Sequence, residues 1–504
     1  MTRELLKMIK AKLIAPLFLA ILVFPSVAFA KPVNQSTAEQ VALNFLANEV
    51  YYTPGQPLTL VNGTTTSQGY YIFSNDNCFV IISGDDASEP ILAYSTESGY
   101  NTNKVSPEVS YMLGNYSQQI KFIANNQVPA TSEINTRWTN LVNNVVTENK
   151  TPPASVQNLL KTLWDQAPYY NDMCPVDNNP NDQYYNQLTV TGCVATAMAQ
   201  VLKFWNYPKK GIGSNSYDDN PYGTLSMAFD TANFDWSSMS NRLVKANPAV
   251  AELMYSCGVA VDMSYGVAAT GGSAASVVAT GGSRGANTQK CAQTALTNYF
   301  GYDASTIKGL NASNYADTTW LNILTNEISS GRPVIYDGFD SADEGHCFVF
   351  DGYRTTAGHI MMHVNWGWSG YENGYFAVNQ LNPGAGQIGS GTIGAFNIGQ
   401  QAIIGIQPPP GAVAAIETPA NSTGSVKVYP NPANDHLTAD LSGINGTAQQ
   451  INLINIQGKM VYSIIPGNNV SEITVNTANM EGGIYVLQIL TDKGVVNSKV
   501  VISR

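Results

Sequence analysis

The sequence is poor in charge, in histidine and in long apolar runs. Only 12% of its 504 residues are charged, and the formal net charge is −11. A sparse, mainly acidic charge argues against nucleic-acid binding, which needs clustered Lys and Arg. Beyond residue 30 no stretch reaches about eighteen consecutive apolar residues, so we expect no transmembrane span after signal removal. The four histidines, the available bases of this type, are His346, His359, His363 and His436.

Cysteine is also scarce. The six cysteines are Cys78, Cys174, Cys193, Cys257, Cys291 and Cys347. One catalytic thiol would leave an odd number, which does not favour a complete disulfide framework and leaves a single bridge open. Where no base lies near in sequence, as for Cys257, Cys291 and Cys347, we expect a small buried apolar residue.

Two patterns that imitate metal sites each lack a required residue. His359 and His363 are four apart, but Ile360 replaces the glutamate of the zinc motif and the context is a strand. The run from Asp177 to Leu188 starts like a calcium loop, but its sixth residue is Asp instead of Gly and its twelfth is Leu. We therefore expect a packed strand histidine at 363, an Asn/Asp-rich turn near 177, and no cofactor.

The N-terminus has the pattern of an export signal. Basic residues precede an apolar run at 13–29, which ends in the small-residue site Ala28-Phe29-Ala30. This pattern predicts a signal peptide, with mature protein beginning near Lys31.

The segment from Thr191 to Gln200 is the most informative in the chain. It places Cys193 directly after Gly192, where a loop becomes a helix. The first amides of a helix lack intrahelical acceptors, so they and the helix dipole favour a thiolate there. Gly192 leaves room for a substrate backbone to approach. Apolar residues at helical spacing continue to Trp205, and Pro208 marks the end.

A nucleophilic thiol needs a base and a group that orients the base. His346 opens an apolar run that predicts a buried strand, and a second strand is predicted over His359–Asn365. Asn365 can hold the imidazole of His346 while the tryptophans that follow shield that bond from water. The chain order of Cys193, His346 and Asn365 fits the papain-type arrangement.

At these residues the chain resembles the streptopain family of papain-like cysteine peptidases. The resemblance spans roughly residues 155–407, and four segments carry it: 191–197, 261–266, 345–349 and 363–368. It implies that Cys193 is the nucleophile, His346 the general base and acid, and Asn365 with Trp366 the orienting pair. Gln166 matches the glutamine whose side-chain amide joins the Cys193 backbone N–H in the oxyanion hole, where charge develops on the scissile carbonyl.

The sequence upstream of residue 152 forms a separate part. A helix around 41–45 and strands at 70–73, 78–85 and 91–94 are predicted, and this part resembles the family's inhibitory prodomain. The polar stretch 147–153 is a cleavable linker by composition. Apolar residues then predict a short helix over 156–163.

The last eighty or so residues form a small all-β part. Pro408-Pro409-Pro410-Gly411 begins a linker, and a hairpin at 451–459 and a strand at 483–489 follow. The order of segments resembles the C-terminal sorting domain of the type IX secretion system. An Ig-like binding module, which shares the strand pattern without the export role, is the alternative.

A repeat departs from the family pattern. Val267–Ser273 and Val277–Ser283 are nearly the same sequence, rich in glycine and small residues. Such a composition predicts a mobile loop with little core to bury. In the family a shorter counterpart borders the pocket for the substrate's second residue before the cut, so the extension indicates either length variation or a change of specificity.

The predicted fold class is α+β: a papain-like two-subdomain cysteine peptidase, preceded by an α+β inhibitory prodomain and followed by a small all-β Ig-like sandwich. The predicted segments are a signal peptide at 1–30, an inhibitory propeptide at 31–152, the peptidase at 153–407, a linker at 408–424 and the sorting domain at 425–504.

The resemblance implies a secreted cysteine endopeptidase, made as a zymogen, that cleaves proteins or peptides through a Cys193 acyl-enzyme and is inhibited by its own propeptide. It implies a secreted or outer-surface location reached through the periplasm, with the outer-membrane secretion machinery as the partner of the C-terminal domain. A non-catalytic adhesin or binding module is one alternative, against which the intact set of Cys, His, Asn and Gln argues. A transferase or amidase using the same dyad is another.

Overall fold

The computed structural model describes residues 30–49, 57–61, 68–102, 105–145, 155–178, 180–181, 183–279, 289–339, 345–356, 358–378, 398–412, 426–444, 446, 448–455, 460–464, 466, 470–478, 480–491 and 494–503. Residues 1–29 of the predicted signal peptide and the polar stretch at 147–153 lie outside them. We call residues 30–145 the N-terminal region, 155–412 the central region and 426–503 the C-terminal region.

The N-terminal region contains the predicted helix and strand meander together with two helices that the sequence did not predict. Its elements are α1 (Gln35–Ala47), β1 (Thr59–Leu60), β2 (Tyr70–Ser74), β3 (Phe79–Ser83), β4 (Ile91–Ser95), α2 (Pro107–Asn125) and α3 (Ser132–Val142). Helix α2 begins where it does because the Ser106 side chain accepts a hydrogen bond from the Val109 amide and Pro107 occupies the first turn. Its buried face, including Tyr116, packs on the meander.

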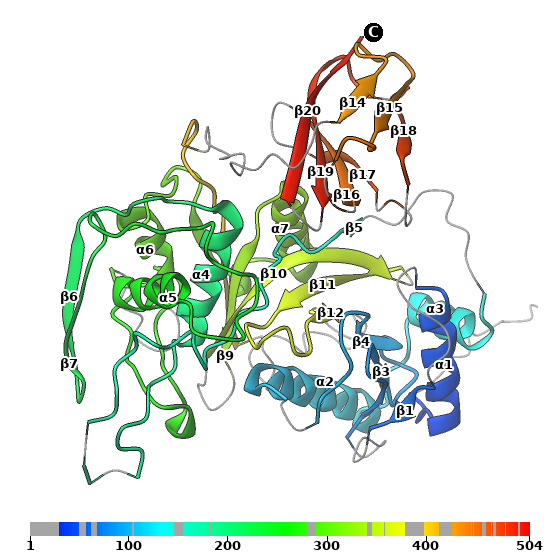
Figure 1. Ribbon diagram of the computed structural model, residues 1–504. Helices are drawn as coiled ribbons and strands as arrows, with labels where there is room; N and C mark the ends of the chain where they lie inside the picture. The colour runs from blue at the N-terminus through cyan, green and yellow to red at the C-terminus, as the bar shows by residue number, and fades with distance from the viewer. Residues whose placement is uncertain are drawn as a thin grey trace, which may run out of the picture.

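One sheet joins the N-terminal and central regions. Its order is β1-β2-β3-β4-β12-β11-β10-β9-β13-β8, and β5 pairs with β10 at the side. Strand β4 pairs antiparallel with β12 (Gly374–Phe376), with Ala93 opposite Phe376 and Tyr94 opposite Tyr375. Figure 1 shows the blue N-terminal strands continuing the sheet beside β12. The two regions also share one hydrophobic core, so neither is a separate globule.

The remaining strands of this sheet belong to the central region. They are β5 (Ser155–Val156), β8 (Lys308–Asn311), β9 (Val334–Phe339), β10 (Gly345–Thr356), β11 (His359–Asn365) and β13 (Ile398–Ile404). Helix α7 (Asp317–Ser329) packs on β9 and β10. The predicted strands at 347–353 and 359–365 are thus confirmed as parts of β10 and β11.

The helical half of the central region has its own core. It contains α4 (Cys193–Trp205), β6 (Ser214–Asp219), β7 (Gly223–Ala228), α5 (Pro248–Ala260), η1 (Ala268–Thr270), α6 (Ala292–Asn298) and η2 (Ala312–Asn314). Helix α4 packs against α5 on one side and β10 on the other. The central region is therefore two halves that meet along α4, as expected for a papain-like α+β fold.

The helix predicted over residues 156–163 is wrong. Residues 157–163 have no regular secondary structure, because tertiary partners take their backbone amides. Leu159 N–H donates to the Asp351 carbonyl at 2.7 Å, Leu160 N–H to the Asp351 carboxylate at 3.0 Å, and Leu163 N–H to the Asn241 carbonyl at 2.7 Å. The apolar residues in this segment bury along an extended path, so their helix-like spacing is accidental.

The C-terminal region is a small β-sandwich with its own core, as predicted. One sheet has the order β14-β15-β18 and the other β17-β16-β19-β20. The strands are β14 (Lys427–Tyr429), β15 (His436–Asp440), β16 (Ala448–Asn455), β17 (Met460–Ile464), β18 (Glu472–Asn476), β19 (Gly483–Thr491) and β20 (Gly494–Ile502). Among the helices of the described residues, none has the length and apolar character that a membrane crossing requires.

Candidate active site

Cys193 is the first residue of α4, as the sequence predicts. Gly192 precedes it at the N-cap with φ of 86°, and no side chain caps the helix. The backbone amides of Val194 and Cys347 lie close enough to the Cys193 sulfur to lower the pKa of its thiol. The end of a helix and the start of strand β10 therefore meet at this thiol, where unpaired amides can stabilise a thiolate.

Gly192 is required by its backbone and by its neighbours. A positive φ disfavours any residue with a Cβ. A Cβ here would also lie 3.0 Å from the Met263 sulfur and 3.1 Å from the Ser273 carbonyl oxygen. The glycine therefore fixes the entry into α4 in addition to leaving space at the thiol.

The described part of the repeated loop, residues 267–279, is anchored, which corrects the expectation of a mobile loop. Ser273 Oγ donates to the Val190 carbonyl at 2.6 Å and accepts from the Gly266 amide at 3.0 Å. Val277 and Val278 are buried in the core of the helical half. Serine and valine within the repeat supply the contacts that its glycine content concealed. Residues 280–283 lie outside the described residues.

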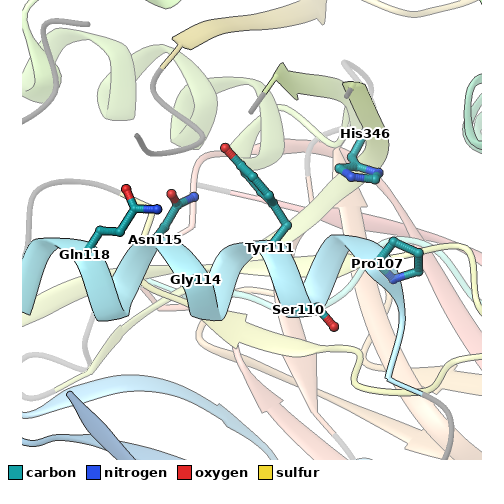
Figure 2. Close-up of a pocket in the computed structure, with 7 residues that line it drawn as sticks. All are labelled: Pro107, Ser110, Tyr111, Gly114, Asn115, Gln118 and His346. Carbon is teal, nitrogen blue, oxygen red and sulfur yellow. The ribbon is translucent and has the colours of Figure 1, made fainter. Parts of the chain in front are cut away.

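His346 faces helix α2 of the N-terminal region. Its Nδ1 atom lies 3.5 Å from Glu108 Oε1, and its ring lies 5.9 Å from the ring of Tyr111. Figure 2 shows the imidazole above the first turns of α2. A cavity of about 290 Å³ opens here, lined by Pro107, Ser110, Tyr111, Gly114, Asn115, Gln118 and His346. The N-terminal region therefore occupies the space in front of the predicted base.

The same helix affects the predicted nucleophile electrostatically. Burial raises the pKa of the Cys193 thiol to about 12, the Glu108 and Asp337 carboxylates add to the rise, and the two backbone amides oppose it. A thiol with so high a pKa stays protonated at neutral pH and is a poor nucleophile. The surroundings of Cys193 in this arrangement of the chain therefore disfavour its thiolate.

The Asn365 amide is engaged by groups close to α4. Its Oδ1 accepts from Gln200 Nε2 at 3.1 Å and from the Gly367 amide at 3.1 Å, and its Nδ2 donates to the Thr162 carbonyl at 2.8 Å. Asn365 is therefore rigidly placed at the end of β11. Its predicted bond to the imidazole of His346 stays a prediction.

Trp366 and Gln166 also lie at this junction. Trp366 is buried between the rings of Phe348 at 4.8 Å and Phe376 at 5.0 Å. Gln166 is buried, and its carbonyl accepts from the Thr191 amide at 3.4 Å, directly beside the Gly192–Cys193 step. Gln166 thus lies beside the N-terminus of α4, and Trp366 follows β11 directly after Asn365.

Sequence reasoning missed a set of ionic contacts between the N-terminal and central regions. His363, expected to be a packed strand histidine, is buried between Asp351 at 2.5 Å and Glu97 at 3.0 Å. Burial alone would lower the pKa of His363, but the two carboxylates raise it to about 10. The imidazolium is therefore the favoured form.

Two further basic side chains of the central region have glutamate partners in the N-terminal region. His359 Nδ1 lies 3.5 Å from Glu89, and Arg354 pairs with Glu49. Together with His346 and His363, four cationic or titratable groups of the central region each meet a different glutamate. No sequence spacing indicates these pairs, because each partner lies hundreds of residues away. Only an excess of glutamate upstream and of histidine downstream could have suggested them.

The described residues contain neither a metal-binding cluster nor a disulfide bond. Within the described ranges, no group of three or more His, Cys, Asp or Glu side chains could hold a metal ion. The six cysteines are all described and all are free thiols, so the single bridge left open by the sequence is not formed.

Comparison with known families divides the chain as the structure does. The peptidase C10 family matches residues 164–376, a family described as Spi protease inhibitor matches residues 30–120, and a secretion system C-terminal sorting domain matches residues 427–503.

Individual proteins similar to this chain include cysteine proteases and a related precursor of known structure. Streptopain from Streptococcus pyogenes is 33% identical over 413 residues, which cover 77% of this chain and 94% of that protein. The thiol protease/hemagglutinin PrtT from Porphyromonas gingivalis is 26% identical over 75% of this chain and 42% of its own length. The structure of a mutant prointerpain A fragment from Prevotella intermedia superposes with a TM-score of 0.50 and 29% identity, covering 71% of this chain and all of the fragment.

Proposed function

The chain belongs to the peptidase C10 family of streptopain, and from this premise we propose that Cys193 attacks the scissile carbonyl while His346 serves as general base and acid. The protein is a cysteine peptidase with a protease-inhibitor-like N-terminal region and a C-terminal sorting domain. It forms an acyl-enzyme at Cys193, which water activated at His346 then hydrolyses.

One observation carries the assignment of the dyad. The backbone amide of the residue directly after His346 lies close enough to the Cys193 sulfur to lower the pKa of the thiol. Strand β10, which bears the base, therefore packs on helix α4 next to the nucleophile.

The oxyanion is assigned to the Cys193 backbone N–H and the Gln166 side chain. The backbone contact between Gln166 and Thr191 supports this role, because it fixes Gln166 one step before the Gly192–Cys193 turn. Two such donors stabilise the charge that develops on the substrate carbonyl oxygen.

Residues 31–152 act as an inhibitory prodomain. Helix α2 lies in front of His346, and its Glu108 carboxylate attracts the imidazole. Burial is the main cause of the raised pKa of Cys193, and the Glu108 charge adds to it. The chain is thus a zymogen in which base and nucleophile are both held out of action. Cutting the linker near 147–153 lets the prodomain leave.

Glu108→Gln should accelerate maturation of the full-length chain. Without the carboxylate, the pKa of Cys193 falls and His346 loses its ionic partner, so self-processing should be about 3- to 10-fold faster, in proportion to the thiolate fraction. A time course on gels at low protein concentration, together with the rate of Cys193 alkylation, measures this. Glu133→Gln, on the exposed side of α3, is the matched control. Equal rates for the two variants would show that Glu108 does not restrain the dyad.

The C-terminal region directs export and contributes nothing to the chemistry. It has a separate core and supplies none of the proposed catalytic residues. As a secretion-system sorting domain, it takes the protein to the cell exterior or outer surface. We assign its partner to the type IX outer-membrane machinery.

Deleting residues 425–504 should separate export from catalysis. The purified truncated protein should keep the specific activity of the processed enzyme within about twofold, because the sandwich buries its own core. In the native host, activity in the medium and on the cell surface should disappear, with the protein retained in the periplasm. A loss of activity in purified protein would mean that the sandwich is a structural part of the peptidase.

The assignment as a peptidase, in preference to a transferase or amidase, has a direct test. Titration of the processed protein with an epoxide thiol inhibitor counts active sites, and digestion of an unstructured protein measures peptide-bond hydrolysis. One equivalent of inhibitor should abolish digestion.

A further inference from the structure

Glu372 is a fully buried acid with little polar support. It lies between Trp366 and β12 and is 0% exposed. Its Oε1 accepts a hydrogen bond from the Asn101 backbone amide at 3.3 Å. Its Oε2 is buried and has no hydrogen-bond partner among the described residues. Buried carboxylates normally receive several donors or a cation, so one long amide contact leaves this group poorly compensated.

The prodomain provides this contact. Asn101 follows β4 and belongs to the prodomain, whereas Trp366 and Asn373, beside Glu372, belong to the peptidase. The Glu372 carbonyl accepts from Trp366 Nε1 at 3.0 Å, and the neighbouring Asn373 side chain accepts from the Trp366 backbone amide at 3.1 Å. Departure of the prodomain removes this donor and opens the carboxyl to water, because Tyr100 and Asn101 are the prodomain residues that lie against it.

The surroundings favour the neutral acid. Burial raises the pKa of Glu372 from 4.5 to about 7, and the Asn101 amide opposes this only in part. The titratable group that faces it is Tyr100 of the prodomain, whose own pKa is raised by burial and then by Tyr70 and Glu372. Among the described residues no cation offsets the Glu372 charge.

We propose that Glu372 couples prodomain seating to proton uptake: closing of residues 100–101 over this carboxyl binds one proton, and their departure releases it. This inference rests on the proposed role of residues 31–152 as a prodomain. It deepens that role, because it makes the ease of zymogen opening depend on pH.

The direction of the pH dependence follows from the pKa of Glu372 in the closed and open states. The closed-state pKa lies above the ordinary value of 4.5, so the stabilisation is complete below pH 4.5 and is lost as pH rises to about 7. The equilibrium constant for opening should rise on the order of 40-fold between pH 5 and pH 7 and level off above that. The zymogen is therefore held more tightly in mild acid than at neutral pH.

Three other ionisable groups at the interface have shifted pKa values, and one of them contributes to the pH dependence between pH 5 and pH 7. Burial would raise the pKa of Glu97, but His363 lowers it, so Glu97 titrates below this window. His363 titrates above it. Burial raises the pKa of Glu49 despite Arg354, which adds a slope of the same sign. Comparison between variants is therefore needed to separate the contribution of Glu372 to the pH dependence from that of Glu49.

The test uses the full-length Cys193→Ala chain, which cannot process itself. Hydrogen-exchange protection factors of the β4 amides that face β12 report opening, and they are corrected for the intrinsic effect of pH. Protection should decrease between pH 5 and pH 7 in the parent, and this decrease should exceed that of the Glu372→Gln variant by a factor on the order of 40. Glu372→Met, similar in volume and uncharged, should give the same reduced slope and serves as the second variant if Gln disturbs the fold.

A matched control separates charge pairing from proton coupling. Glu97→Gln removes the His363 contact and should lower protection at each pH while keeping the parent's slope. Parallel profiles for the parent and both Glu372 variants would overturn the proposal. Absence of protection in β4 at every pH would contradict the prodomain assignment as well, and the readout does not depend on Cys193 being the nucleophile.

Discussion

Cys193→Ala should abolish proteolysis and leave the full-length chain unprocessed. Removing the sulfur removes the acyl-enzyme route, so turnover should fall by about four to six orders of magnitude, to what binding and the oxyanion hole alone provide. Digestion of an unstructured protein measures the first effect, and the size of the purified chain measures the second. The mutation removes one small side chain at a helix start, so the thermal transition should be nearly unchanged.

His346→Ala is the companion variant. Nucleophile and base act as one unit, so the single and double variants should be equally inactive instead of additive. Asn365→Ala should be milder. A Cys193→Ala chain that still matures when purified alone would refute autocatalytic activation, and one that still digests substrate would refute the nucleophile.

Gln166→Ala should lower kcat by about 100-fold or more, corresponding to about 3 kcal/mol of transition-state stabilisation. The lost group is one of two donors to the developing oxyanion, so binding of substrate should change little. The ratio of kcat to KM in the processed enzyme measures the effect.

Alkylation of Cys193 provides the control for Gln166. Thiolate formation does not use the oxyanion hole, so the rate of reaction with an alkylating reagent should stay within about twofold of the parent. A decrease of turnover of less than threefold would show that Gln166 is structural, held by its contact with Thr191. A matching loss of alkylation would point to misplacement of α4.

The sequence predicted those parts of the site that depend on local rules. A cysteine after a glycine at a helix start, and a histidine and an asparagine on apolar strands, follow from helix-end chemistry and residue periodicity. The structure has α4 beginning at Cys193 and β10 and β11 carrying His346 and Asn365. The resemblance to a family then supplied Gln166, which no local rule would have found.

The errors came from segments whose partners are distant. Leu159, Leu160 and Leu163 have helical spacing, but Asp351 and Asn241 take their amides. The glycine content of the repeat after Gly266 predicted a mobile loop, but no sequence pattern indicated that Val277 and Val278 are buried. Local pattern cannot report a tertiary hydrogen bond, and the partners in each case come from other elements.

The contacts between the two regions were the least predictable feature. Glu108, Glu97 and Asn101 meet His346, His363 and Glu372 across the interface. Each pair joins positions far apart in sequence whose spacing carries no signal. The charges of the prodomain become meaningful only when the shared sheet brings them opposite the peptidase.

The continuous sheet also determines what the enzyme becomes after activation. Loss of β4 turns β12 into an edge strand with unpaired amides and carbonyls, a surface on which foreign strands can add. Strand β12 is only three residues long, shorter than the usual five or six, and it follows a turn at residues 369–372. The mature peptidase thus acquires an edge too short to template a stable partner strand. A precursor built as one sheet can shed its first strands without leaving behind a surface prone to aggregation.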